Sequence, residues 1–60
     1  MNTVTSTYVK FRQGTQWRWH LVANNNRIVA NSGEAYHNEA DCDHAIALVK
    51  ASFNSPVIRK

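Results

Sequence analysis

The fold of this chain is decided by residues 17–32, WRWHLVANNNRIVANS. Apolar and polar side chains alternate along residues 17–23 and again along residues 27–32, and this period of two is typical of β-strands. The three asparagines between the two runs tolerate the positive φ of a hairpin turn better than any other residue except glycine. The stretch therefore predicts a β-hairpin.

The alternation also predicts which side chains share a face. Along residues 17–23, both tryptophans fall on one side and Arg18 and His20 on the other. Along residues 27–32, the same pattern groups Ile28, Ala30 and Ser32. We expect Trp19 to lie in the core, and Trp17, which is nearer the strand end, to be partly exposed.

A further strand is predicted at residues 6–12, joined to the hairpin by a tight turn at residues 13–15. Val9 and Phe11 fall on one side of this strand, whereas Tyr8, Lys10 and Arg12 fall on the other. Residues 1–5 are small, polar and unpatterned, so we expect them to form a frayed lead-in.

A helix is predicted from Asn38 to near Phe53. Asparagine is a favoured N-cap residue, and acidic residues in the first turns complement the helix dipole. Pro56 follows shortly after the expected end and cannot continue a helix. Apolar residues at helical spacing form one stripe that should cover the sheet: Cys42, Ala45, Ile46, Val49 and Phe53.

The four residues after the helix, Pro56, Val57, Ile58 and Arg59, predict a short final strand. Val57 and Ile58 are β-branched, and a proline is tolerated at the first position of a strand. A strand this short is stable only against a sheet edge. The edge of a second copy is as available to it as its own.

The length of the chain favours self-association. Sixty residues form one domain, which buries only about 60% of the surface of its unfolded chain. Cys42 is the single cysteine, so no disulfide forms within one chain, and the three histidines show none of the spacings of a zinc site. A second copy is then the remaining source of stability.

The charge and hydropathy of the sequence limit the partners and the cellular compartment that we expect for the protein. The formal net charge of +3 permits a polyanionic partner without requiring one. The sequence has no secretory signal and no run long enough to cross a membrane. With one free thiol, this pattern predicts a cytoplasmic protein that does not bind membranes.

One set of residues resembles a known family in its order and spacing. The set is Trp17-Arg18-Trp19, Leu21, Ala23, Asn25, Ile28, Ala30, Ser32, Tyr36, Ala40, Ile46 and Val49-Lys50. It covers more than half of the chain and resembles the YegP-like proteins, which are small proteins of bacteria and archaea. Asn26 departs from the glycine that this family usually has in the hairpin turn.

The resemblance implies an α+β fold in two layers: a β-β-β-α-β unit with a mostly antiparallel sheet and one packing helix. Family members combine two such units, which share a sheet and exchange their C-terminal strands. The present chain holds one unit, so the resemblance implies a homodimer in which Pro56, Val57, Ile58 and Arg59 cross to the partner. The family has no established catalytic residues, and none is transferred.

A basic sheet face is the first candidate site. The alternation places five residues on or near the side expected to be uncovered: Lys10, Arg12, Arg18, His20 and Arg27. With Tyr8, they would attract phosphates and stack on bases, as single-stranded nucleic-acid binders do. Solvation of an exposed sheet face explains the same charges more simply.

Two further clusters have a chemical interpretation and a simpler structural one. Glu34, Tyr36 and His37 could perform acid–base chemistry, or could be solvated loop residues around a packed tyrosine. Cys42 and His44 lie two apart on a helix and do not face each other, so Cys42 is expected to be a buried, inert thiol.

We therefore predict no catalytic, cofactor-binding or metal-binding residue. The favoured function is a non-enzymatic, homodimeric interaction or accessory protein. The alternatives are a weak nucleic-acid binder that uses the basic face, and a small enzyme or ligand binder that uses the Glu34, Tyr36 and His37 cluster.

Overall fold

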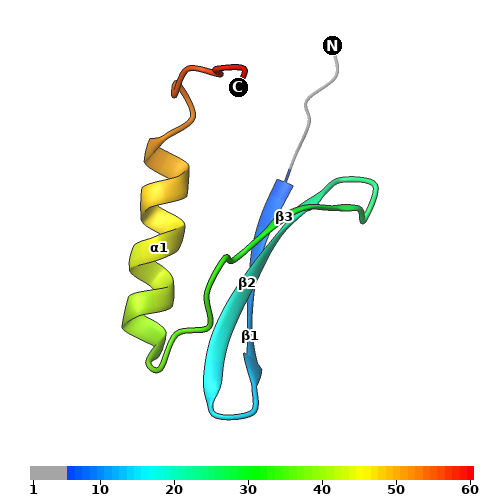
Figure 1. The fold of residues 1–60 in the computed structure, drawn as a ribbon. Helices are drawn as coiled ribbons and strands as arrows, with labels where there is room; N and C mark the ends of the chain where they lie inside the picture. Colours follow the sequence, from blue (N-terminus) through cyan, green and yellow to red (C-terminus); the bar gives the residue numbers. More distant parts are fainter. Residues whose placement is uncertain (1–5) are drawn as a thin grey trace.

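The structure, a computed structural model, describes residues 6–60 as three strands and one helix. The strands are β1 (Ser6–Gln13), β2 (Gln16–Ala23) and β3 (Ile28–Asn31), and the helix is α1 (Glu39–Ala51). They form one antiparallel sheet in the order β1-β2-β3, with α1 beside it (Figure 1). The predicted α+β fold class is confirmed, and the lead-in predicted at residues 1–5 lies outside the described residues.

The turn between β1 and β2 fixes the register of the sheet. Gln13 pairs with Gln16, so the loop holds only Gly14 and Thr15. Gly14 has a φ of +66°, and a glycine with positive φ at the first of two loop positions is the pattern of a type II′ hairpin turn. The turn predicted at residues 13–15 is therefore one residue too long.

This register decides which side chains share a face, because residues directly opposite one another in an antiparallel pair point to the same side. Tyr8 pairs with Leu21, and Lys10 pairs with Trp19. Trp19 is buried, and Lys10 forms ion pairs with α1, so this is the helix-covered face. The opposite side, here called the open face, consists on β1 and β2 of Thr7, Val9, Phe11, Gln13, Gln16, Arg18, His20 and Val22.

The hairpin between β2 and β3 confirms the expected use of asparagine. Asn26 has a φ of +66°, and its backbone N–H donates to the Ala23 carbonyl at 2.9 Å. The register then shifts between Leu21 and Val22. Leu21 pairs with Ala30 on the helix-covered face, whereas Val22 pairs with Ile28 on the open face. The predicted grouping of Ile28 with Ala30 is wrong, because this irregularity interrupts the alternation.

Beyond β3 the chain stays beside β2. The Ser32 backbone N–H donates to the Trp19 carbonyl at 2.9 Å, and the Ser32 hydroxyl accepts from the Trp19 backbone N–H at 3.3 Å. Tyr36 then exchanges two backbone hydrogen bonds with Trp17, at 2.7 and 2.8 Å. These contacts bring the chain to the start of α1.

The helix begins as predicted and ends earlier. Asn38 is the N-cap, and its side-chain oxygen accepts from the Asp41 backbone N–H at 3.3 Å. The last helical residue is Ala51, because both the N–H and the hydroxyl of Ser52 donate to the Val49 carbonyl. With thirteen residues, the single helix among residues 6–60 is too short to cross a membrane.

The core is concentrated at the N-terminal end of α1. The buried apolar residues are Trp19 and Cys42, the latter with no exposed surface. Along the predicted stripe the exposed fraction then rises, reaching 36% at Val49 and 83% at Phe53. Figure 1 shows the reason, since α1 starts near the sheet and diverges from it towards its C-terminal end.

The segment after the helix finds no sheet edge in the single chain. Residues 56–59, predicted as a strand, have no regular structure. Val57 is 96% exposed and Ile58 72% exposed. An exchange of this segment with a second copy stays a prediction.

Candidate functional site

The five residues predicted to form a basic face are divided between the two sides of the sheet. Lys10 and Arg12 pair with the two tryptophans on the helix-covered face, whereas Arg18 and His20 lie on the open face. Arg27 lies in the hairpin turn, where it is exposed. The prediction of one shared face is wrong because a two-residue turn shifts the register by one, and such a shift reverses every side chain of a strand. Nucleic-acid binding stays a prediction.

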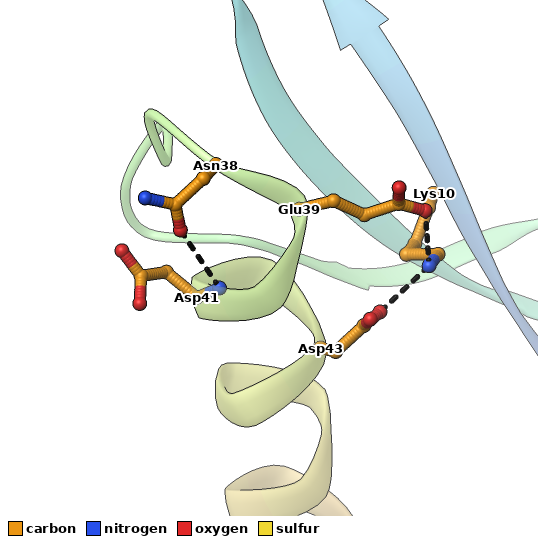
Figure 2. Close-up of polar contacts among 5 residues, drawn as sticks. All are labelled: Lys10, Asn38, Glu39, Asp41 and Asp43. Carbon is orange, nitrogen blue, oxygen red and sulfur yellow. Dashed lines mark hydrogen bonds and ion pairs between the residues drawn. The ribbon is translucent and has the colours of Figure 1, made fainter.

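Lys10 joins the sheet to the first turns of α1 (Figure 2). Its Nζ donates to Glu39 Oε2 at 2.6 Å and to Asp43 Oδ1 at 2.7 Å. The hydrogen bond that Lys10 donates to Asp43, followed by the one that it donates to Glu39, raises the pKa of Lys10. Sequence reasoning assigned the two acids to the helix dipole alone. Their spacing of four residues, which places them on one side of a helix, was the available signal for this contact.

Aromatic residues surround Lys10 on the helix-covered face. The Tyr8 and Trp19 rings meet edge to face with centroids 5.6 Å apart. The Arg12 guanidinium lies 5.7 Å from the centre of the Trp17 ring, and Lys10 Nζ lies 6.0 Å from it. Both separations are within reach of a cation–π attraction. This face therefore uses its two cations to pack against aromatic rings and α1.

The open face combines aromatic, aliphatic and cationic side chains. The Phe11 and His20 rings lie 4.7 Å apart between centroids, inclined by 58°. Arg18 Nη2 donates to the Ser32 carbonyl at a long 3.4 Å, and Val9 is exposed. Among the described residues the ion pairs are those of Lys10, so Arg18 has no carboxylate partner.

A third surface is apolar and extends from the end of α1 into the C-terminal segment. We call it the tail surface and define it by three exposed residues: Phe53, Val57 and Ile58. Large exposed apolar groups close together are typical of surfaces that another chain covers.

The cluster at residues 34–37 is organised around Tyr36. The backbone of Tyr36 is bonded to Trp17, and its side chain is half buried, whereas Glu34 and His37 are exposed. Burial raises the pKa of Tyr36, and the negative charges of Glu34 and Cys42 raise it further. Within residues 6–60, no hydrogen bond joins the three side chains.

Cys42 is a buried thiol, as predicted. Burial, with smaller contributions from neighbouring charges, raises its pKa. The protonated form is therefore favoured, and a protonated thiol is a poor nucleophile. No group of three metal-ligating side chains occurs in the part of the chain that the structure describes.

Comparisons with known proteins agree on one family. The profile of a domain of unknown function, DUF1508, matches residues 13–57. The chain belongs to the DUF1508 family. Two UPF0339 proteins of Neisseria meningitidis, from serogroup A and serogroup B strains, are each 40% identical to it over 45 residues. These matches cover 75% of this chain and 79% of each relative.

The fold of this DUF1508 member also matches a solved structure. A protein from Haloferax volcanii, determined in solution by NMR, superposes with a TM-score of 0.80 at 28% identity. The match covers 100% of this chain and 98% of the other. The predicted resemblance to the YegP-like proteins is thereby confirmed, and with it the α+β architecture.

Proposed function

We propose that this DUF1508 protein acts as a homodimeric, non-enzymatic interaction protein in which two copies cover each other's tail surfaces. The observation that carries the proposal is the rise in exposure along one helical stripe. Cys42 is fully buried at its start and Val49 is 36% exposed near the end of α1, whereas Phe53, just beyond the helix, is 83% exposed. A stripe with helical apolar spacing needs a cover over its whole length, and one chain covers only its first half.

The C-terminal segment has the properties of the missing cover. Val57 and Ile58 favour extended structure, and Pro56 stands where a strand tolerates proline. Among residues 6–60, β1 pairs only with β2, so its outer edge offers backbone donors and acceptors to a further strand. A strand from a second copy would satisfy such an edge while its apolar side chains leave water.

The exposed apolar side chains of the tail surface would contribute to dimer stability on the same scale as the cost of association. Burying a Val, Ile or Phe side chain contributes about 1.5–3 kcal/mol. Weighted by the exposed fractions of Phe53, Val57 and Ile58, the tail surface of each chain offers roughly 4–7 kcal/mol. Two chains offer twice that, which is comparable with the cost of association.

The cellular compartment and the absence of a proposed catalytic role are inferred from other residues, namely Cys42 and the cluster at residues 34–37. We infer a cytoplasmic protein, because the single thiol is buried and held in its protonated form, as a reducing compartment permits. No enzymatic role is proposed, since the side chains of Glu34 and His37 point to solvent around a tyrosine held by its backbone.

Sedimentation equilibrium at micromolar concentrations tests the proposal. We expect a mass of about 13.6 kDa, twice the 6.8 kDa of one chain. Ile58→Asp should shift the protein to the monomer mass, because a carboxylate would have to be buried in the interface. Ser55→Asp adds the same charge at an exposed position and should leave the dimer intact. A stable 6.8 kDa particle for the unmodified chain would overturn the proposal.

A further inference from the structure

The open face of the sheet carries a positively charged side chain and no acidic one. The four acidic residues lie elsewhere: Glu34 in the connection after β3, and Glu39, Asp41 and Asp43 in α1. Arg18 has no ion-pair partner among residues 6–60, and the Phe11 and His20 rings lie next to it on the same face. We propose that the open face binds single-stranded nucleic acid, with a phosphate at Arg18 and a base stacked on the Phe11 or the His20 ring.

Charge complementarity selects this occupant over a second copy of the chain. Two open faces placed together would bury both copies of Arg18 in one interface, and neither face carries a carboxylate to neutralise them. Burying a charge without a partner of opposite sign costs free energy. A polyanion meets the same arginine with the opposite sign, so its binding is favoured.

The side chains match the two parts of a nucleotide. Arg18 uses one donor in a long hydrogen bond of 3.4 Å to the Ser32 carbonyl, and a guanidinium has five donors. The remaining donors are available to phosphate oxygens. The rings of Phe11 and His20 are inclined by 58° to each other, so a base would stack on one ring and meet the edge of the other. Stacking on such rings is tolerant of sequence, so a composition-independent binder is expected.

Lys10 and Arg12, which the alternation predicted beside Arg18, take no part in this site. Lys10 is neutralised by Glu39 and Asp43, and Arg12 lies over Trp17 on the other side of the sheet. The site also does not depend on the proposed dimer, since every residue involved lies on the sheet of one chain.

Fluorescence anisotropy with a labelled oligothymidylate tests the proposal. We expect binding at low salt that weakens as salt rises. Arg18→Gln should weaken binding roughly ten-fold and reduce the slope of log K against log[salt] by about 0.7, the value of one phosphate contact on a single strand. Arg59→Gln removes the same charge from the C-terminal segment and should leave binding nearly unchanged. Equal losses in the two variants would overturn the site.

The contribution of stacking is tested with Phe11→Leu, which keeps an apolar side chain but removes the ring. Binding should weaken roughly ten- to hundred-fold. Circular dichroism of each variant checks that the fold is retained. If Phe11→Leu fails to fold, methyl NMR of the unmodified protein decides. Bound oligonucleotide should then shift Val9 and Val22 on the open face and leave Leu21 and Ala30, on the helix-covered face, unchanged.

Three further results would refute the inference. The first is the absence of binding at low salt. The second is a set of methyl shifts confined to the helix-covered face. The third is binding to vesicles of anionic lipid without binding to the oligonucleotide, which would assign the face to a membrane surface. Because sedimentation reports on the dimer separately, failure of this site and failure of the proposed function are distinguishable.

Discussion

Deletion of residues 56–60 tests whether the protein is stable as a single chain or needs a second copy to cover this segment. In the single chain Val57 is 96% exposed and Ile58 is 72% exposed. Their deletion from a monomer would therefore leave the free energy of unfolding almost unchanged. Covered by a partner, the same two side chains contribute about 1.5–3 kcal/mol each when fully buried. Weighted by their exposed fractions, the expected loss is roughly 2.5–5 kcal/mol per chain.

The expected change in melting temperature follows from this loss. In a domain of this size 1 kcal/mol shifts the melting temperature by about 4–8 °C, so the truncated chain should melt at least ~10 °C earlier. Circular dichroism at several protein concentrations measures the shift. The unmodified chain should also melt at higher temperature when it is more concentrated, as a dimer requires.

Two variants separate side-chain burial from chain length in this experiment. Val57→Thr combined with Ile58→Thr keeps the length and the β-branched shape but adds hydroxyls, so it should lower the melting temperature as well. Arg59→Gln combined with Lys60→Gln alters the same segment without touching its apolar residues and should have little effect. If the chain truncated after Ser55 melts with the unmodified protein at every concentration, the reasoning is refuted.

Two further predictions concern the sheet and the contact between Lys10 and α1. Gly14→Ala should destabilise the protein by about 1–2 kcal/mol in urea unfolding, because the backbone φ at this position is +66°. A steric clash is not the cause, since the added Cβ would meet no atom within 4 Å. Asn26→Gly, at the same φ, is the control and should not destabilise the protein. Stability should fall as pH rises above about 9, since the folded state raises the pKa values of Cys42, Tyr36 and Lys10 and so retains protons that the unfolded chain loses. Lys10→Met should remove the part of this loss that occurs above the ordinary lysine pKa of 10.5, and urea unfolding between pH 8 and 12 measures it. An unchanged pH profile in Lys10→Met would show that the ion pairs do not stabilise the fold.

Much of the architecture was predictable because its signals are local. The alternation along residues 17–23, the asparagines of the hairpin turn and the N-cap at Asn38 each depend on a few neighbouring residues. All three are present in the structure. The burial of Cys42 was predictable for the same reason, since helical spacing assigns it to the apolar stripe.

The faces of β1 were not predictable from alternation alone. A period of two divides a strand into two sets of side chains, but the turn decides which set meets which set of the neighbouring strand. A turn of three residues would pair Lys10 with Arg18, whereas the observed turn of two pairs Lys10 with Trp19. Reading Gly14 as the first position of a two-residue loop would have given the correct register.

The extent of the core was overestimated for a different reason. Helical spacing grouped Phe53 with Cys42, but the helix ends at Ala51, and spacing does not say how far the helix follows the sheet. The distance between α1 and the sheet depends on the connection after Ser32 and on the backbone bonds of Tyr36, which act at long range. The exposed half of the stripe is consequently a feature that only the three-dimensional structure reveals.

The corrected register separates the two proposed activities in space, and this makes them independently testable. Ile58 belongs to the segment that continues from α1, whereas Arg18 lies on the face of the sheet turned away from α1. Substitutions at distant sites without shared partners have nearly additive effects. Ile58→Asp should therefore abolish the dimer while each monomer that remains folded keeps the salt-dependent contact of Arg18. Arg18→Gln should weaken oligonucleotide binding at an unchanged mass of about 13.6 kDa, twice that of one chain. Loss of both properties in either variant would mean that the open face and the tail surface belong to a single interface.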